Sequence, residues 1–196
     1  MTQVAIVYHS GYGHTKHVAE SVEAGVKSVA GVTAHLIAVD AEGNVPEAAW
    51  ATLGSSDAII FGSPTYMGGA SWQFKKFADA SSKPWSGQAW KDKIAAGFTN
   101  SATMNGDKHS TLHYFITLAM QHGMHWVGTG MKSANTKAAK RDDLNYVGSY
   151  SGMMAQSPSD SAPHEVPAGD LATAKAFGAR VAEVAKKRSN IDGGTF

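Results

Sequence analysis

The chain has 196 residues, with 17 Lys and Arg against 16 Asp and Glu, 21 glycines and no cysteine. This length suits one domain with a full hydrophobic core, so we expect residues 1–196 to form a single domain. The balanced charge offers no basic excess for binding a nucleic acid, and the absence of cysteine excludes disulfides, thiolate nucleophiles and iron–sulfur clusters. No apolar run approaches the roughly 20 residues of a membrane span, and no basic leader precedes the first apolar segment, so we expect a cytoplasmic protein without a membrane span.

Short apolar runs alternate with helical patterns in the first half of the chain. Val4–Tyr8 is too short for a helix and rich in β-branched residues, which predicts a strand. Valines spaced by four, four and three residues then mark one helix face over residues 18–29. Strands are predicted at Thr33–Val39 and within Asp57–Gly62, with a short helix after Pro46 between them.

The second half continues this alternation. A helix face over residues 70–78 precedes a predicted strand at residues 93–99. The clearest helical stripe runs from residue 112 to residue 123, and a fifth strand is predicted at Met124–Gly128. A closing helix spans residues 171–185. Strand–helix alternation repeated about five times predicts a three-layer α/β sandwich whose parallel strands are joined by right-handed crossovers.

One stretch interrupts the rhythm before the last helix. Residues 131–169 are rich in Ser, Pro, Gly and Asn, and we expect them to form a long loop or insertion. A loop of this length in a compact domain is usually functional or disordered. The sequence leaves open whether the segment is a lid, an interface or a disordered loop.

The loops after the strands are the candidate site, because open α/β sheets bind ligands beyond the carboxyl ends of their strands. The first loop, Ser10–Lys16, has glycines that let the backbone approach an anion, and helix-start N–H groups that would face it. It lacks the P-loop spacing, and Lys16 replaces the third glycine of a dinucleotide fingerprint. Its S-x-x-G-x-T pattern suits a terminal monophosphate, while an ordinary turn with Ser or Thr capping the helix is the alternative.

Two further loops complete this edge. The loop over residues 62–69 contains Pro64, Tyr66 and Met67, and the loop over residues 99–106 offers polar side chains and N–H groups without fixed charge. Together they suit a flat, uncharged ring with an amide edge. No metal site is predicted: His109 and His113 share a helix face, but no third ligand accompanies them.

Four segments carry a family resemblance. They are the motif V-Y-x-S-x-Y-G-H from Val7 to His14, the run Asp57–Thr65, the predicted helix with Gln73, Lys76 and Phe77, and Leu118–Ala119 followed by His122–Met124. On these segments the chain resembles the WrbA type of NAD(P)H:quinone oxidoreductase in the flavodoxin-like superfamily, in order from the first strand to about residue 130. The resemblance implies a flavodoxin-like sandwich whose five-stranded parallel sheet has the order 2-1-3-4-5, with helices on both faces.

The resemblance also implies FMN as cofactor and NAD(P)H as co-substrate. The phosphate would lie on the first loop, and the flavin ring against the second and third loops. The implied cofactor-binding residues are Ser10, Gly11, Tyr12, Gly13, His14, Thr15, Pro64, Thr65, Tyr66, Met67, Thr99, Asn100, Ser101, Ala102, Thr103, Asn105 and His122.

Tyr12, Trp85 and His122 are the residues that the resemblance implies for the substrate cavity. Tyr12 matches a position in the nicotinamide pocket, and Trp85 matches an aromatic that relatives supply across a subunit interface. His122 would approach the flavin's pyrimidine edge or the substrate cavity from a neighbouring turn. The family further implies a homotetramer. Departures such as Tyr66 and Met67, where many relatives carry an arginine and an aromatic, leave the substrate and the choice of NADH or NADPH open.

The implied reaction transfers two electrons from NAD(P)H to a quinone-like acceptor, with both substrates using one cavity in a ping-pong mechanism. A flavodoxin-like electron carrier or FMN-binding module without its own substrate is the alternative. Electron carriers usually present a strongly acidic face to their partners, and a net charge of +1 argues against such a face. A third possibility is a Rossmann-type nucleotide-binding domain, with Asp40 as the ribose-binding acid.

Overall fold

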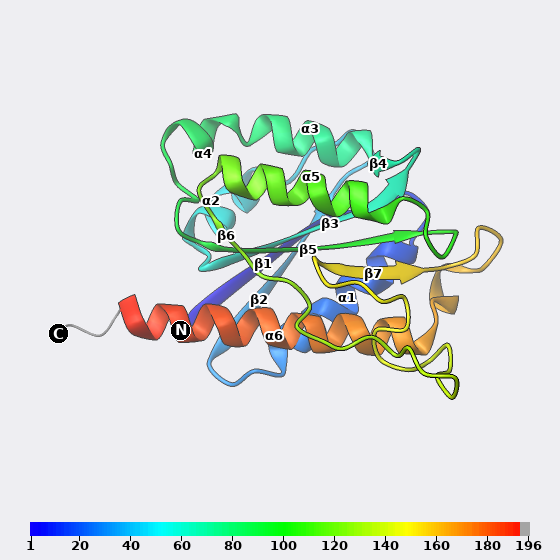
Figure 1. Ribbon diagram of the computed structural model, residues 1–196. Coiled ribbons are helices and arrows are strands. Elements are labelled where there is room, and N and C mark those ends of the chain that lie inside the picture. The colour runs from blue at the N-terminus through cyan, green and yellow to red at the C-terminus, as the bar shows by residue number, and fades with distance from the viewer. Residues whose placement is uncertain (193–196) are drawn as a thin grey trace.

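A single sheet organises residues 1–192, the part of the chain that the computed structural model describes (Figure 1). The strands are β1 (Thr2–His9), β2 (Val32–Val39), β3 (Ala58–Tyr66), β4 (Gly69–Ala70), β5 (Ile94–Ser101), β6 (His125–Trp126) and β7 (Met153–Gln156). The helices are α1 (His14–Lys27), α2 (Glu47–Ser55), α3 (Trp72–Ala80), α4 (Ser82–Ser86), α5 (Lys108–Gln121) and α6 (Ala168–Asp192), with a 3-10 turn, η1, at Pro163–Glu165.

The sheet has the strand order β2-β1-β3-β5-β6, which confirms the predicted order 2-1-3-4-5. All of these neighbours pair in parallel, as the right-handed crossovers require. The short β4 pairs with β3 in antiparallel orientation, and β7 pairs with β5 in parallel.

The edge strand beside β5 is divided into two pieces. We expected one strand over Met124–Gly128, but β6 covers only His125–Trp126, and β7 takes over the same edge of β5 after residues 127–152. The chain leaves the sheet at Gly128, where a Cβ would lie 2.3 Å from the carbonyl oxygen of Tyr150. Gly130, with φ of 62°, then turns the chain outward. The edge is therefore completed by a strand that the sequence pattern did not predict.

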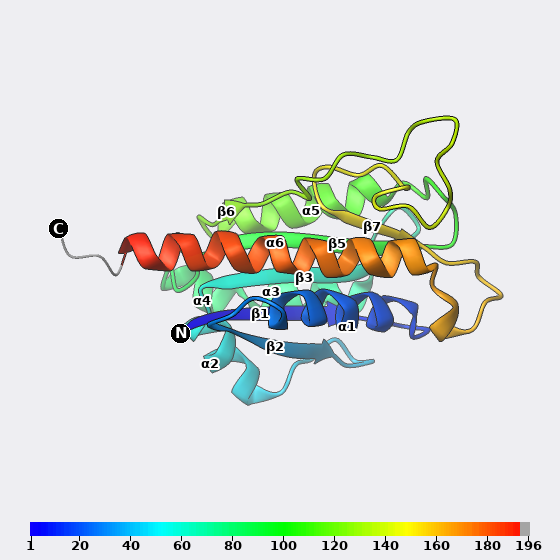
Figure 2. The same cartoon turned by 90° about the horizontal axis from the view of Figure 1, so that it is seen from below.

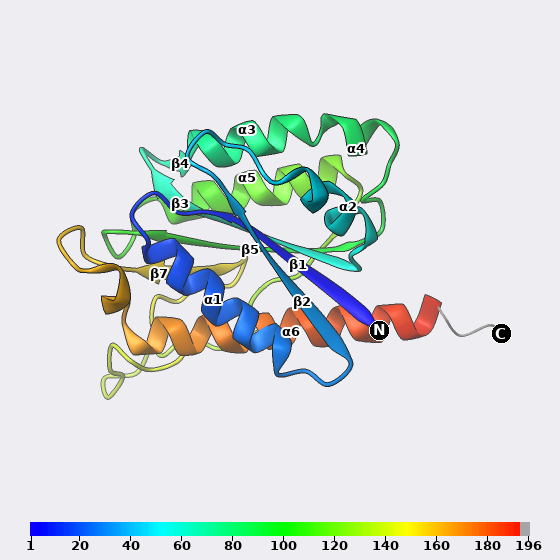
Figure 3. The same ribbon diagram turned by 180° about the vertical axis from the view of Figure 1, so that it is seen from behind.

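The helices form one layer on each face of the sheet (Figures 2 and 3). On one face, α1 and α6 pack against strand residues that include Val4, Ile6 and Ile60. On the other face, α2, α3 and α5 bury a second set that includes Val7 and Phe61. These alternating strand residues point to opposite faces because successive side chains in a strand do so.

Two glycines let α1 and α6 cross at backbone distance. A Cβ on Gly25 would lie 1.9 Å from the carbonyl oxygen of Lys175, and a Cβ on Gly178 would lie 2.1 Å from that of Val22. No other residue type fits at either position without moving one helix. Part of the glycine excess thus serves helix packing rather than loops.

The segment expected as a long loop, residues 131–169, contains β7 and η1 and is fastened to α6. The backbone N–H of Asn145 donates to the hydroxyl of Thr173 at 2.8 Å, and its side chain bonds to Met131 and Ser149. Asn145 is buried and has φ of 53°, a conformation that Asn tolerates better than most residues. Within residues 1–192, no helix is both long enough and apolar enough to cross a bilayer.

Candidate functional site

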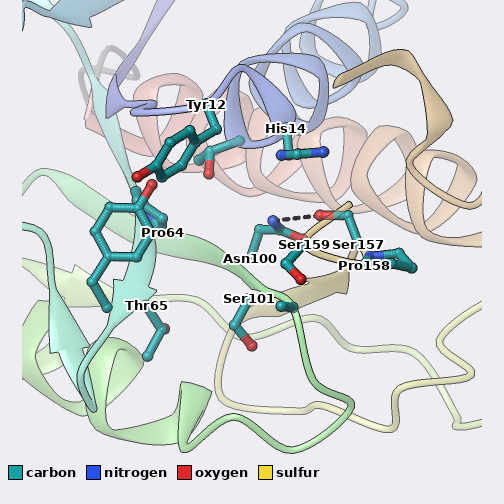
Figure 4. Close-up of a pocket in the computed structure, with 12 residues that line it drawn as sticks. Tyr12, His14, Pro64, Thr65, Asn100, Ser101, Ser157, Pro158 and Ser159 are labelled. Atoms are coloured by element: carbon teal, nitrogen blue, oxygen red, sulfur yellow. Dashed lines mark hydrogen bonds between the residues drawn. The ribbon is translucent and has the colours of Figure 1, made fainter. Parts of the chain in front are cut away.

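One cavity opens at the carboxyl edge of the sheet (Figure 4). Its volume is about 460 Å³, within the range of roughly 300–1,000 Å³ that small-molecule sites occupy. The wall is formed by the three loops that the sequence singles out and by a fourth loop after β7. The lining residues are Tyr12, His14, Thr15, Pro64, Thr65, Tyr66, Asn100, Ser101, Ala102, Ser157, Pro158 and Ser159.

The first loop forms a hydrogen-bonded turn that leads directly into α1. The Ser10 hydroxyl accepts hydrogen bonds from the backbone N–H groups of Gly13 and Lys16, each at 3.1 Å. Gly13 has φ of 94° and no room for a Cβ, which would lie 2.9 Å from Pro163. The Ser10 hydroxyl therefore holds the turn, but the N-cap of α1 is Gly13 and has no side-chain cap, while His14 and Thr15 line the cavity at the first turn of α1. No acidic residue occupies that turn, so its partial positive charge is uncompensated.

The second loop is a strand and a tight hairpin. We expected Pro64–Tyr66 in a loop, but β3 continues through Tyr66 and turns into β4 at Met67 and Gly68. These two residues have φ of 46° and 79°, the positive values of a two-residue hairpin turn. Pro64 is tolerated because β1 pairs with β3 only as far as Gly62, so Pro64 lacks a β1 partner. The side chain of Met67 is fully exposed and does not line the cavity.

Three buried threonines hold the floor of the cavity. The hydroxyl of Thr65 lies 2.8 Å from those of Thr99 and Thr111, which joins β3 to β5 and α5. Thr99 and Thr111 are completely buried. Thr99, one of the implied cofactor residues, thus lies beneath the cavity and not in its wall.

The side chain of Asn100, next to Thr99 in β5, has one hydrogen-bond acceptor without a partner. Its side-chain amide donates to the Ser157 hydroxyl at 2.8 Å (Figure 4). Its other side-chain atom, Oδ1, is buried and has no hydrogen-bond partner within the described chain. A buried carbonyl oxygen without a partner is costly, so a ligand that donates an N–H or O–H group here would be favoured.

The fourth wall comes from the segment after β7, which the sequence analysis did not assign to the site. Ser157 donates its backbone N–H to the carbonyl of Ser101 at 3.1 Å, and Pro158 and Ser159 follow it along the cavity. The ring of His14 closes this side through a 3.0 Å hydrogen bond to the carbonyl of Ser161. The only sequence signal was the unusual length of the segment.

Aromatic rings border the open side of the cavity. Tyr12 is 77% exposed, and its ring meets that of Tyr66 edge-on at 6.2 Å. Partial burial raises the pKa of Tyr66 above its usual value, so its hydroxyl stays protonated at neutral pH. A flat ligand could therefore find aromatic edges and a neutral hydroxyl at this rim.

His122 and Trp85 lie at the opposite edge of the sheet. His122 follows the last residue of α5, a helix of 14 residues that starts at the cavity edge and runs back toward the start of β5 (Figure 1). Such a helix is about 20 Å long. His122 is therefore not in the wall of this chain's own cavity, and its implied place at the flavin or the substrate cavity stays a prediction. Trp85 lies beside it, and its indole N–H donates to the carbonyl of Gln121 at 3.1 Å.

His122 is a buried neutral histidine. Its Nε2 atom lies 2.9 Å from the Ser81 hydroxyl, and its ring centroid lies 4.3 Å from that of Trp90. Burial lowers the pKa of His122 to about 4, so the ring is uncharged at neutral pH. One edge of it still borders a shallow surface depression of about 430 Å³, which Trp85 also lines.

Several other implied residues do not line the cavity and instead form hydrogen bonds within their own loops. Asn105 accepts the backbone N–H of Asp107 at 3.0 Å, and the carbonyl of Thr103 accepts a hydrogen bond from Lys108. Ser10, Gly11 and Gly13 shape the first loop without lining the cavity. Asp40, the possible ribose-binding acid, accepts the backbone N–H groups of Glu42 and Asn44 at 3.0 and 2.7 Å and is not a lining residue.

Within residues 1–192, no cluster of three or more His, Asp or Glu side chains is arranged to hold a metal ion. His109 and His113, the pair considered from the sequence, have ring centroids 6.3 Å apart and stand alone on α5.

The model of the family of NADPH-dependent FMN reductases matches residues 10–138, more than half of the chain. The chain belongs to this family. It is 49% identical over 187 residues to flavodoxin FldP of Pseudomonas aeruginosa, covering 95% of this chain and 98% of the relative. It is 34% identical over 203 residues to an NAD(P)H dehydrogenase (quinone) of Geobacter sulfurreducens, covering 94% and 98%.

A crystal structure of a flavodoxin, WrbA-like protein from Agrobacterium tumefaciens is also similar. It shares 50% of the residues, with a TM-score of 0.76, and the match covers 95% of this chain and 99% of that one. This similarity confirms the flavodoxin-like fold and the WrbA-type resemblance.

The residues of the cavity fit FMN. The unpartnered Oδ1 of Asn100 matches the imide and hydroxyl donors of this cofactor, and the first turn of α1 suits its phosphate. Of the segment Ser10–Thr15, to which the resemblance assigns the phosphate, Tyr12, His14 and Thr15 line the cavity, and Thr65, Tyr66 and Asn100 would border the remainder of the cofactor.

Proposed function

We propose that this FMN-dependent oxidoreductase passes two electrons from NAD(P)H to a quinone-like acceptor. The observation that carries the proposal is the chemistry of the cavity wall, since none of its twelve lining residues is an Asp, Glu, Lys, Arg or Cys. Such a wall can bind and orient a ligand, but it offers neither a carboxylate acid–base pair nor an activated nucleophile. FMN supplies the redox chemistry when bound, by accepting a hydride and passing its electrons on.

The side chains of the cavity bind and orient in this proposal. Asn100 accepts a hydrogen bond from the cofactor, and the first turn of α1 attracts its phosphate. Tyr12 and Tyr66 stand at the rim, where either a nicotinamide or a quinone can pack against an aromatic ring. Because one rim serves both substrates, the first product must leave before the second substrate binds.

A ping-pong mechanism follows from this shared rim and is tested by steady-state kinetics. Rates measured at several fixed quinone concentrations, with NADPH or NADH varied, should give parallel double-reciprocal lines. Intersecting lines would mean that both substrates bind together, and the shared cavity would then be rejected.

We also propose a homotetramer in which another copy brings Trp85 and His122 to the cavity. Trp85 is 52% exposed, and it shares its surface depression with His122 and Met120, whose side chain is 50% exposed. An exposed aromatic beside apolar neighbours is typical of an interface. The variant His122→Ala is then expected to retain FMN and to slow quinone reduction, and unchanged kinetics would remove His122 from the site. Light scattering that gives a monomer with FMN bound would contradict the assembly.

A flavodoxin-like electron carrier is the second candidate, because a relative with 49% identity is named a flavodoxin. A carrier receives electrons from a partner protein, whereas the proposed enzyme takes them directly from the nicotinamide. Anaerobic addition of NADPH or NADH to the FMN-loaded protein distinguishes the two. Bleaching of the flavin absorption within the time of one turnover supports the enzyme, and bleaching only after a reductase is added supports the carrier.

A further inference from the structure

Lys108 is a completely buried lysine that the proposed reaction does not yet use. It is the first residue of α5, directly after the third loop of the cavity. A buried ammonium group is rare unless its charge is matched by hydrogen-bond acceptors. Its three partners are therefore informative about what the residue does.

All three partners belong to the loop that forms the cavity wall. The Nζ atom of Lys108 donates to the hydroxyl of Ser101 at 2.9 Å and to the carbonyls of Thr103 and Met104 at 2.6 and 2.9 Å. Ser101 itself lines the cavity. The ammonium group thus bonds directly to one residue of the cavity wall.

The preceding carbonyl of the loop is held from the same segment that supplies the fourth wall. The side-chain amide of Gln156 donates to the carbonyl of Ala102 at 2.7 Å. Three consecutive carbonyls, those of residues 102–104, are thereby tied to side chains. In a trans peptide the N–H points opposite to the carbonyl, so the N–H groups of residues 104 and 105 point away from Lys108. An ammonium group on the carbonyl side polarises these peptides and makes their N–H groups stronger donors.

The charges around Lys108 leave one net positive charge. Asp170 and Arg141 are the charged groups that act on it, and they form a bidentate ion pair with distances of 2.7 and 2.6 Å. This pair is neutral as a whole. Burial lowers the pKa of Lys108 to about 8, so the amine keeps its proton at pH 7. The wall of the cavity contains no carboxylate that would cancel the charge.

We propose that Lys108 is a positioning residue that fixes the third loop and, through its charge, raises the reduction potential of the bound FMN. The inference rests on the proposed function. A hydride brings two electrons and one proton from the nicotinamide, which is oxidised, so the flavin gains one negative charge. A fixed positive charge behind the wall then favours the reduced cofactor over the oxidised one. Protein groups of this kind are known levers on cofactor electronics.

The test is the two-electron midpoint potential of the FMN-loaded protein in matched variants. Lys108→Gln keeps hydrogen-bond donors for the loop and removes the charge, while Lys108→Met removes both. Lys93→Gln is the control, because Lys93 also bonds two backbone carbonyls, those of Gly54 and Ser56, but at the other edge of the sheet.

We expect reduced FMN to lose at least tenfold more affinity than oxidised FMN in both Lys108 variants. This ratio corresponds to a fall of about 30 mV in the two-electron midpoint potential. Lys108→Met should also weaken the binding of oxidised FMN, because the loop is no longer held, and Lys93→Gln should change neither quantity.

A purely structural lysine gives a different result. If Lys108→Gln keeps the wild-type potential, or if Lys108→Met weakens oxidised and reduced FMN equally, the proposal is overturned. Should Lys108→Met fail to fold, the comparison of Lys108→Gln with Lys93→Gln still decides it. Failure of the wild-type protein to bind FMN would instead reject the proposed function, so the two failures are distinguishable.

Discussion

Among the cavity residues, Asn100 gives the most direct indication of a bound ligand. Its Oδ1 atom is buried at the cavity without a partner, while its amide is already committed to Ser157. Replacing it by alanine removes one ligand hydrogen bond, which is worth about 1 kcal/mol. We therefore expect Asn100→Ala to raise the FMN dissociation constant about five- to tenfold in a fluorescence titration.

The control for this variant is Asn135→Ala, an exposed amide in the segment between β6 and β7. It should leave FMN affinity unchanged. If Asn100→Ala binds FMN as tightly as the wild type does, then Asn100 does not contact the cofactor.

His122 makes the stability of the fold depend on pH. Its pKa is about 4 in the folded chain and 6.5 when unperturbed, so between these values the unfolded state binds more protons. The free energy of unfolding is therefore complete above pH 6.5 and decreases as the pH falls toward 4, by an amount on the order of 3 kcal/mol. Burial also lowers the pKa of His9, which adds to the loss in the same direction.

Urea unfolding at pH 7.0, 6.0, 5.0 and 4.5 measures this dependence. His122→Gln should flatten the profile, whereas His113→Gln, on the exposed side of α5, should retain it. Identical profiles for both variants and the wild type would show that His122 is not the titrating group.

The residues of the first three loops were predictable, and those of the fourth were not. Glycines and hydroxyls after a β-branched run identify a strand–helix turn locally, and parallel topology brings such turns to one edge. Ser157–Ser159 reach the cavity only because β7 pairs with β5, a long-range contact with no spacing signature. For His122, the family motif implies a role at the site without saying at which edge of the sheet the residue lies.

At the scale of elements, the crossing of α1 and α6 depends on two glycines. A methyl group at Gly178 would meet the carbonyl oxygen of Val22 at 2.1 Å, a backbone atom that cannot rotate away. We expect Gly178→Ala to destabilise the protein by about 1–3 kcal/mol, because the helices must separate. Thermal unfolding would measure this as a lower midpoint.

Gly54 provides a matched helical control. A Cβ added there in α2 has nothing within 4 Å, so Gly54→Ala should be neutral or stabilising by up to about 1 kcal/mol. Equal midpoints for Gly178→Ala and the wild type would mean that the helices do not approach as closely as described.

The elements that sequence patterns predicted were those with strong local periodicity. The helices α1, α3, α5 and α6 and the first four strands of the predicted sheet have buried runs or faces that repeat at regular spacing, whereas α2 was predicted from Pro46 at its start. The two-residue β4 is too short for any periodicity, β6 is shorter than the strand predicted at Met124–Gly128, and β7 lies within a stretch rich in Ser and Gly. Their pairing is decided by the sheet and not by their own sequence.

At the scale of the whole molecule, the carboxyl edge carries a cavity without catalytic charge, and Lys108 supplies a buried charge behind it. Trp85 and His122 lie at the far edge, so only an assembly could join them to a cavity. These features fit a protein that binds and orients a cofactor, while the cofactor supplies the redox chemistry.

The visible absorption spectrum of the protein after addition of FMN and gel filtration tests this account most directly. We predict that one equivalent of FMN remains with each chain and that its absorption bands shift from those of free FMN, because the ring leaves water for the cavity. A colourless protein, with all FMN eluting as the free cofactor, would contradict the account.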